Sequence, residues 1–394
     1  MLFPKAKFSM AFLSNDAINR VYVHAGVQAL ATGAGGLFVV VFLLRAGVPI
    51  PIALLSQAAI FAGRFLLRPT MLPLARRFGV RPLLIAGTLM IAGSYPILAF
   101  VHGVGGVLWL FCAVSAAADV FYWVSFHSYF AALGDAEHRG HQVGAREAVV
   151  AVVSIIAPLL GAAGLTWLGP LWTFTLVALA QAASVIPFLG APDLALVREA
   201  PGALRAARLV VALNLAEGWF DAFLLLLWRV GLFLSLASSV SNYGGAMALA
   251  GLVGAVGGPL FGRHLDRGGG QRVTLIAYTA LTGLLLLRAF CLGVPWLAVV
   301  ANALEALVFP LMAPAVGAAA YNLAKRSPCP FRFHLATEAG WDIGCGLGLV
   351  VAAGLCALGA RLGPVILLGL PGIGAAGLML WRYYRPAAVL EAVN

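Results

Sequence analysis

The feature that most constrains this chain is a succession of unbroken apolar stretches, each about as long as a helix that crosses a lipid bilayer. Such a helix needs about 20 apolar residues. Here 62% of the 394 residues are hydrophobic and only 10% are charged. A soluble protein would have too little polar surface to cover that much apolar surface. The pattern therefore excludes a soluble enzyme, a disordered chain and a small disulfide scaffold. It also argues against a β-barrel, whose strands alternate over segments of about 10 residues.

The apolar stretches predict an all-α integral membrane protein with about 12 transmembrane helices. We expect two pseudo-symmetric six-helix bundles, at 1–190 and 209–394, because the longest polar stretch, 191–208, divides the chain near its middle. That stretch is expected to be a cytoplasmic linker. The expected spans lie near 18–44, 50–67, 83–102, 105–132, 147–167, 170–190, 209–232, 240–262, 273–292, 296–322, 334–359 and 363–382.

The positive charges alternate between loops. The chain carries 25 Lys and Arg against 14 Asp and Glu, and its formal net charge is +11. Most basic residues fall in every second loop, whereas the opposite loops hold only Arg45 and Arg361. The positive-inside rule then places both termini in the cytoplasm. The basic charge is therefore interpreted as an orientation signal, and no nucleic-acid partner is expected because no contiguous basic face is evident. The expected location is a cell membrane, crossed many times, most simply a bacterial inner membrane.

The two halves of the chain repeat each other. A basic loop at 76–81 follows the second expected span, and a similar loop at 266–272 follows the eighth. The segment that begins the fifth span, with Glu147, matches the segment that begins the eleventh, with Glu338. Two parallel six-span halves are an arrangement known in transporters.

The loop after the eighth span carries a family resemblance. Gly262, Asp266, Arg267 and Gly269 match G-x-x-x-D-R-x-G, the signature loop of the major facilitator superfamily. In the first copy only part of the pattern remains: Arg77, Gly79 and Arg81 match, while Leu72 and Arg76 replace the first Gly and the Asp. A weaker similarity to the antiporter motif of the family's exporters is carried by Gly144, Pro158 and Gly161. The resemblance implies two bundles that rock around a central cavity lined mainly by spans 1, 4, 7 and 10.

Polar and ionisable residues inside the spans are the candidate cavity residues, because burying them in a bilayer is costly unless they serve a function. Glu217 and Asp221 lie one turn apart near mid-span. Since two like charges this close repel, one is expected to hold a proton, which makes the pair a candidate proton carrier. The alternatives are a carboxylate satisfied by a neighbouring helix and aromatic residues that only pack. The candidates for the substrate and proton cavity are His24, Gln28, Asp119, Trp123, His127, Asn214, Glu217, Asp221, Asn302 and Glu305.

A second set of charged residues is predicted to form gate-closing ion pairs at the cytoplasmic ends of the spans. The repeat symmetry pairs Glu147 with Arg267, and Glu338 with Arg77 or Arg64. Glycines spaced at Gly340, Gly344 and Gly348 predict a close helix crossing between the halves. The candidate gate residues are Arg77, Glu147, Asp266, Arg267, Glu338 and Asp342.

The leading functional prediction is a secondary active transporter of a small organic solute, most simply a proton-coupled efflux antiporter. One alternative is a proton-coupled importer. Another, of a different class, is an intramembrane lipid-modifying enzyme that uses Asp119 and His127. We do not expect an enzyme. No P-loop signature occurs, so no nucleotide cofactor is expected, and the five cysteines form no C-x-x-C pair, so no metal is expected. The expected partners are the solute, protons and the lipid bilayer, and a monomer is expected.

Overall fold

The computed structural model of this chain describes residues 16–133, 139–194, 196, 199–265, 270–325 and 327–385. In that part of the chain, twelve helices are long and apolar enough to cross a membrane. This confirms the predicted all-α class and the predicted number of spans. The spans lie at Ile18–Arg45, Ile50–Phe78, Val80–Ala99, Gly106–Phe130, Ala148–Trp167, Gly169–Phe188, Ala203–Ser235, Val240–Gly257, Gly270–Phe290, Pro295–Met312, Pro330–Ala357 and Leu362–Tyr383.

In the described part of the chain, eight spans are each formed by one continuous helix, and several of these helices extend beyond the span. They are α3 (Ile50–Phe78), α4 (Val80–Ala99), α5 (Gly106–Leu133), α6 (Arg139–Trp167), α10 (Val240–Leu265), α11 (Gly270–Phe290), α12 (Pro295–Lys325) and α13 (Pro330–Ala357). The helix α3 runs eleven residues past the expected end at 67, because Pro69 and Pro73 are accommodated within it. It ends at Gly79, whose φ of 91° is available to glycine at little cost.

Four spans change helix type along their length. The first joins α1 (Asp16–Ala34), η2 (Gly36–Phe38) and α2 (Val39–Arg45), and the sixth joins α7 (Gly169–Ala183) and η3 (Ile186–Phe188). The twelfth joins α14 (Leu362–Ile366), η5 (Leu367–Gly369) and α15 (Leu370–Tyr383). The seventh joins α8 (Ala203–Asp221), a π-helical turn η4 (Ala222–Leu227) and α9 (Trp228–Ser235). Since π-helical turns are rare and frequent at functional sites, η4 marks the seventh span for attention.

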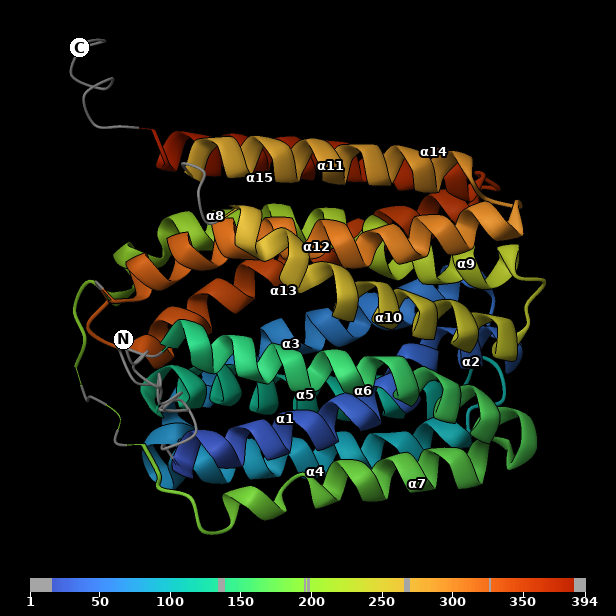
Figure 1. Cartoon of the computed structure of the whole chain (residues 1–394). Helices are drawn as coiled ribbons and strands as arrows, with labels where there is room; N and C mark the ends of the chain where they lie inside the picture. Colours follow the sequence, from blue (N-terminus) through green and yellow to red (C-terminus); the bar gives the residue numbers. More distant parts are fainter. Residues whose placement is uncertain are drawn as a thin grey trace, which may run out of the picture.

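The helices lie side by side in a bundle, with the blue-to-green helices α1–α7 on one side and the yellow-to-red helices on the other (Figure 1). The two groups meet where α3 packs against α13 and where α6 packs against α10. The described chain starts in α1 and ends in α15 at the same end of the bundle (Figure 1), as an even number of crossings requires. The helix α8 begins at Ala203, inside the stretch expected as a linker. The division at 191–208 stays a prediction.

The closest helix crossing lies between α8 and α13. A Cβ atom added at Gly340 would overlap the carbonyl oxygen of Val211, and one at Gly344 would overlap that of Leu215. The glycines therefore let the two backbones touch, as small residues do at membrane helix interfaces. The expectation that this glycine row lies between the halves is wrong, because α8 and α13 both follow the midpoint of the chain. The contact of α13 with α3 includes ion pairs to Arg64 and Arg68 and the packing of Trp341 and Gly346 against Phe61.

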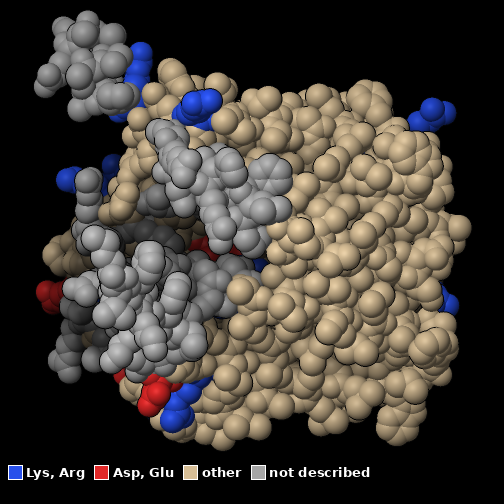
Figure 2. Space-filling model, in the orientation of Figure 1, with Lys and Arg blue, Asp and Glu red and all other residues tan. Residues whose placement is uncertain are grey.

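The surface of the bundle has a broad face almost free of charge (Figure 2). Basic and acidic side chains gather at one end of the molecule, whereas the opposite edge shows only a few Lys or Arg side chains (Figure 2). Large apolar side chains are exposed on the surface of the bundle, among them Leu160 (53%), Leu176 (54%) and Leu179 (62%). In water such a surface would be unfavourable, whereas lipid tails cover it at no cost.

Candidate functional site

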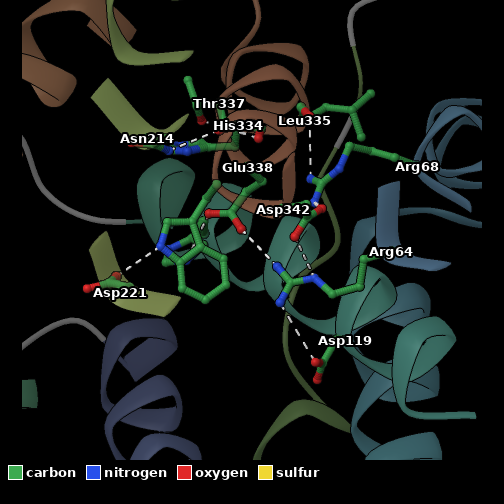
Figure 3. Close-up of polar contacts among 12 residues, drawn as sticks. Arg64, Arg68, Asp119, Asn214, Asp221, His334, Leu335, Thr337, Glu338 and Asp342 are labelled. Carbon is green, nitrogen blue, oxygen red and sulfur yellow. Dashed lines mark hydrogen bonds and ion pairs between the residues drawn. The ribbon is translucent and has the colours of Figure 1, made fainter. Parts of the chain in front are cut away.

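The charged residues of α3, α5 and α13 meet at one place within the bundle (Figure 3). The Arg64 guanidinium of α3 lies 2.9 Å from Asp342 and 3.3 Å from Glu338, both on α13, and 3.7 Å from Asp119 on α5. Arg68, one turn beyond Arg64, pairs with the other oxygen of Asp342. One guanidinium thus connects carboxylates from both halves of the chain.

His127 completes this cluster. Its Nε2 atom lies 3.7 Å from Glu338, and its ring stacks against Trp123 at 5.6 Å and His334 at 5.8 Å. We call Arg64, Arg68, Asp119, His127, Glu338 and Asp342 the Arg64 network.

The Arg64 network is buried on one side and open on the other. The Asp342 side chain is fully buried and that of Arg64 is only 5% exposed. In contrast, the side chains of Asp119, Glu338 and His127 are 30%, 18% and 36% exposed. These three side chains, from α5 and α13, form the accessible part of the network. Ionic groups at this depth are stable only if they pair with one another or contact water.

The polar residues of α8 face α13 beside the Arg64 network. Asp221 accepts a hydrogen bond of 3.1 Å from the Trp341 indole N–H, and the Asn214 amide donates one of 3.0 Å to the Thr337 carbonyl (Figure 3). The Trp341 ring also lies 5.5 Å from the Arg64 guanidinium, in cation–π geometry. Among the residues that the structure describes, Glu217 has neither a hydrogen-bond partner nor an ion-pair partner. Asn214, Glu217 and Asp221, all on α8, thus form the part of the site that the C-terminal helices contribute.

Two further predicted residues, Asn302 and Glu305, belong to a second buried group. The fully buried Arg288 of α11 lies 2.5 Å from Glu305 of α12, which is 26% exposed. Arg288 also donates to the Leu224 carbonyl within η4 and lies over the Trp228 ring, 4.6 Å from its centre. Asn302 accepts a hydrogen bond from the Trp228 indole. The sequence did not indicate this role for Arg288, because its position near the end of an apolar span does not reveal which residues of other helices it contacts.

The predicted residues of the first span lie away from the Arg64 network. His24 is fully buried, and its ring nitrogens lie 2.8 Å from the Ser184 carbonyl and 2.9 Å from the Tyr122 hydroxyl. This placement favours a structural role for His24 within the N-terminal helices. Gln28 donates to Thr32 on its own helix. Trp123 is partly exposed and packs edge-on against Tyr122, and its ring stacks on His127 of the Arg64 network.

The predicted gate pairs have different outcomes. Of the two partners expected for Glu338, the structure shows Arg64 and not Arg77, whose exposed guanidinium lies over the Phe78 ring. Arg77 is too near the end of α3 to reach the middle of α13. The pair between Glu147 and Arg267 stays a prediction, because the Glu147 side chain, Asp266 and Arg267 lie outside the described residues.

Comparison with known proteins gives a match in structure only. No family model and no curated protein matches the sequence. A solved structure of the nucleoside transporter NupG, a point mutant, is 12% identical, covers 93% of this chain and 98% of its own, and superposes with a TM-score of 0.62. The human organic anion transporter MFSD10 (TETRAN) is 16% identical, with 93% and 99% coverage and a TM-score of 0.64. The chain therefore has the fold of these two transporter structures, as the resemblance of its sequence to the major facilitator superfamily implied.

Proposed function

We propose that this protein is a secondary active transporter that moves a small organic solute across a membrane by alternating access. The observation that carries the proposal is the Arg64 network. It joins α3 and α5 to α13 across the middle of the bundle, and its Asp119, Glu338 and His127 side chains are partly exposed. A charged cluster that both connects the halves and is accessible to solvent suits a gate. The transporter fold of the two solved structures supports this function by analogy.

The gate works through competition for Arg64. With all partners ionised, one guanidinium attracts three carboxylates in a medium of low dielectric constant, where such attractions are strong. A solute or a proton that neutralises Asp119 or Glu338 removes part of this attraction. The contact between α3 and α13 then weakens, and the halves at 1–190 and 209–394 can rock about the site. Arg68 retains Asp342, so one connection remains while the other opens.

We further propose that transport is coupled to protons and directed outward. Intramembrane carboxylates are the usual carriers of coupling protons, and Asp119, Glu217, Asp221 and Glu338 lie on α5, α8 and α13, where α13 packs against both other helices. The antiporter-like Gly144, Pro158 and Gly161 favour efflux, and Pro158 lies inside α6 as that motif requires. The alternative is import with protons. We propose a monomer with both termini in the cytoplasm.

An intramembrane enzyme is disfavoured by the geometry of its only candidate pair. Asp119 faces Arg64, whereas His127 faces Glu338 and stacks on Trp123. A nucleophile or base would instead need the two side chains to be within hydrogen-bond reach of each other.

The test is transport by purified protein in proteoliposomes with an imposed pH gradient of either sign. Because the solute is unidentified, nucleosides, amino acids, organic cations and organic anions are supplied as separate radiolabelled panels. A gradient of about one pH unit can support roughly tenfold accumulation if one proton moves per solute. We expect accumulation with one sign of the gradient only, and Asp221→Asn should abolish it while solute exchange continues. If no solute of any panel accumulates in the proteoliposomes with either sign of the gradient, or if accumulation does not depend on the pH gradient, the proposal is wrong.

A further inference from the structure

Asp221 and Glu305 line one small cavity between α8, η4, α11 and α12. Its volume is about 10 Å³, which is room for about one water molecule. Apart from the two acids, its walls are apolar: Phe220, Leu224, Leu225, Leu281, Leu284, Val308, Phe309 and Met312. The two carboxyl groups come from different helices and are the only ionisable groups of this lining, so any charge in the cavity is shared between them.

The lining decides which cation the cavity can take. A sodium or calcium ion is held by about six or more oxygen ligands, and here the side chains offer only those of Asp221 and Glu305. The neighbouring Leu224 carbonyl is already engaged by Arg288. A proton shared through one water molecule needs no further ligands, so the cavity suits a proton and not a metal cation.

The charge balance around the cavity favours one bound proton. Arg288 is fully buried and pairs with Glu305, which leaves the charge of Asp221 without an equal partner. Trp341 donates a hydrogen bond to Asp221 but brings no charge. Arg229, which is half-buried, acts on Asp221 more weakly than Glu305 does, and it makes no ion pair within the described part of the chain. Two carboxylates and one close arginine are therefore neutral with one proton added, the state that a low-dielectric site favours.

The remaining neighbours are compatible with a proton path into this cavity. Glu217 lies one turn before Asp221 on α8, without a partner among the described residues. Tyr278 of α11 is 6% exposed and its hydroxyl has no hydrogen-bond partner among them, while both Glu217 and Asp221 act on it electrostatically. A buried hydroxyl of this kind is normally satisfied by a polar partner such as water. Cys345 of α13 is fully buried, and burial in apolar surroundings keeps a thiol inert.

The π-helical turn gives the cavity its form. It begins at Ala222, directly after Asp221, and ends at Leu227. Within this turn the Leu224 carbonyl accepts a hydrogen bond from Arg288, and the same arginine pairs with Glu305, which lines the cavity. Arg288 is thus a positioning residue for both the turn and the acid.

We infer that Asp221 and Glu305 form one proton-binding unit, which lies among the C-terminal helices α8, α11 and α12 and is separate from the Arg64 network. The inference rests on the proposed function for its role in coupling, but the unit itself is a property of these two side chains. In this arrangement the coupling proton binds beside η4, while the solute and the gate use Asp119 and Glu338.

The experiment is infrared difference spectroscopy of the full-length protein in lipid nanodiscs as the pH is lowered, with the carboxylic acid C=O band as the readout. Asp221→Asn, Glu305→Gln and the double variant are compared with Glu199→Gln, a control at an exposed acid. Each single variant should remove the same protonation step, the double variant should remove nothing more, and the control should match the unaltered protein. Replacing choline chloride by sodium chloride should leave the step in place.

Separate steps that add in the double variant would overturn the inference, as would a step that sodium displaces. Glu305→Gln leaves Arg288 without its ion pair and can prevent folding, in which case Asp221→Asn carries the test: it should remove the step although Glu305 is unchanged, and a step that persists would overturn the inference. Failure of the inference can be distinguished from failure of the proposed function. Proton-driven transport together with independent protonation steps of Asp221 and Glu305 overturns only this inference. A shared step with no gradient-driven transport overturns only the function.

Discussion

Replacing Arg64 by Met should destabilise the protein through the carboxylates that it leaves behind. Arg64 contacts Asp342, Glu338 and Asp119 at 2.9, 3.3 and 3.7 Å and is 5% exposed. Removing one partner of a buried ion pair costs about 3–5 kcal/mol. Asp342 keeps Arg68, and Asp119 and Glu338 are 30% and 18% exposed, so water compensates part of the loss. We therefore expect the lower end of this range, a loss of about 3 kcal/mol.

The assay follows the free energy of unfolding in mixed micelles through reaction of a thiol dye with the buried Cys112, Cys291, Cys329 and Cys345. Arg45→Met is the matched control because Arg45 is exposed at the end of α2, and a change within about 0.5 kcal/mol is expected there. Arg64→Lys should fall between the two, since an ammonium group lacks the planar fork of donors.

A variant that combines Arg64→Met with Asp119→Asn and Glu338→Gln distinguishes the ion pairs from packing. If charge left unpaired is the cause, this variant should recover at least half of the loss, because neutral groups are cheaper to bury than single charges. A loss for Arg64→Met no larger than that of Arg45→Met would refute the reasoning. So would a triple variant less stable than the single one.

Three further predictions concern topology, packing and the tryptophan contact. In a background without native cysteines, His102→Cys and Arg361→Cys should react with an impermeant thiol reagent added outside cells, and Arg205→Cys should not; the reverse pattern would exclude cytoplasmic termini. Gly344→Ala should lower the thermal unfolding midpoint in the thiol-dye assay, because its Cβ would overlap the Leu215 carbonyl. The control Gly354→Ala lies on the same helix, and its added Cβ would meet no atom within 4 Å, so the midpoint should not change. Equal shifts would refute the close crossing. Trp341→Phe removes the indole N–H that donates a hydrogen bond to Asp221. The protonation step seen in the carboxylic acid band should therefore move to a different pH. An unchanged titration would mean that this hydrogen bond does not act on Asp221.

The sequence predicted the spans well because their signal is local. Twenty apolar residues in a row need no knowledge of the rest of the chain, and the predicted spans overlap the observed ones throughout. The larger error came at α3, where Arg68 and Pro69 look like the end of a helix. In the structure Arg68 is buried against Asp342, and this long-range contact keeps the helix within the bundle.

The site was predicted less completely because its contacts are distant in sequence. Arg64 and Glu338 are 274 residues apart, and only the repeat symmetry made Arg64 a candidate at all. Similarly, His24 has the spacing of a cavity residue but is turned into the N-terminal helices by Ser184 and Tyr122. The turn η4 leaves no signature in the run of leucines that forms it, so neither Arg288 nor its carbonyl partner could have been identified from the sequence.

The glycine row of α13 has a mechanical consequence. Where two backbones touch, little soft side-chain volume remains to compress, so α8 and α13 behave as one stiff beam. Glu338 and Asp342 lie on this beam beside α3, and Asp221 with its partner Trp341 lies on it as well. Any shift of the beam relative to α3 therefore carries both sets of charges together. A displacement at the ion pairs becomes a displacement of Asp221 of similar size, with no flexible joint between them to absorb it.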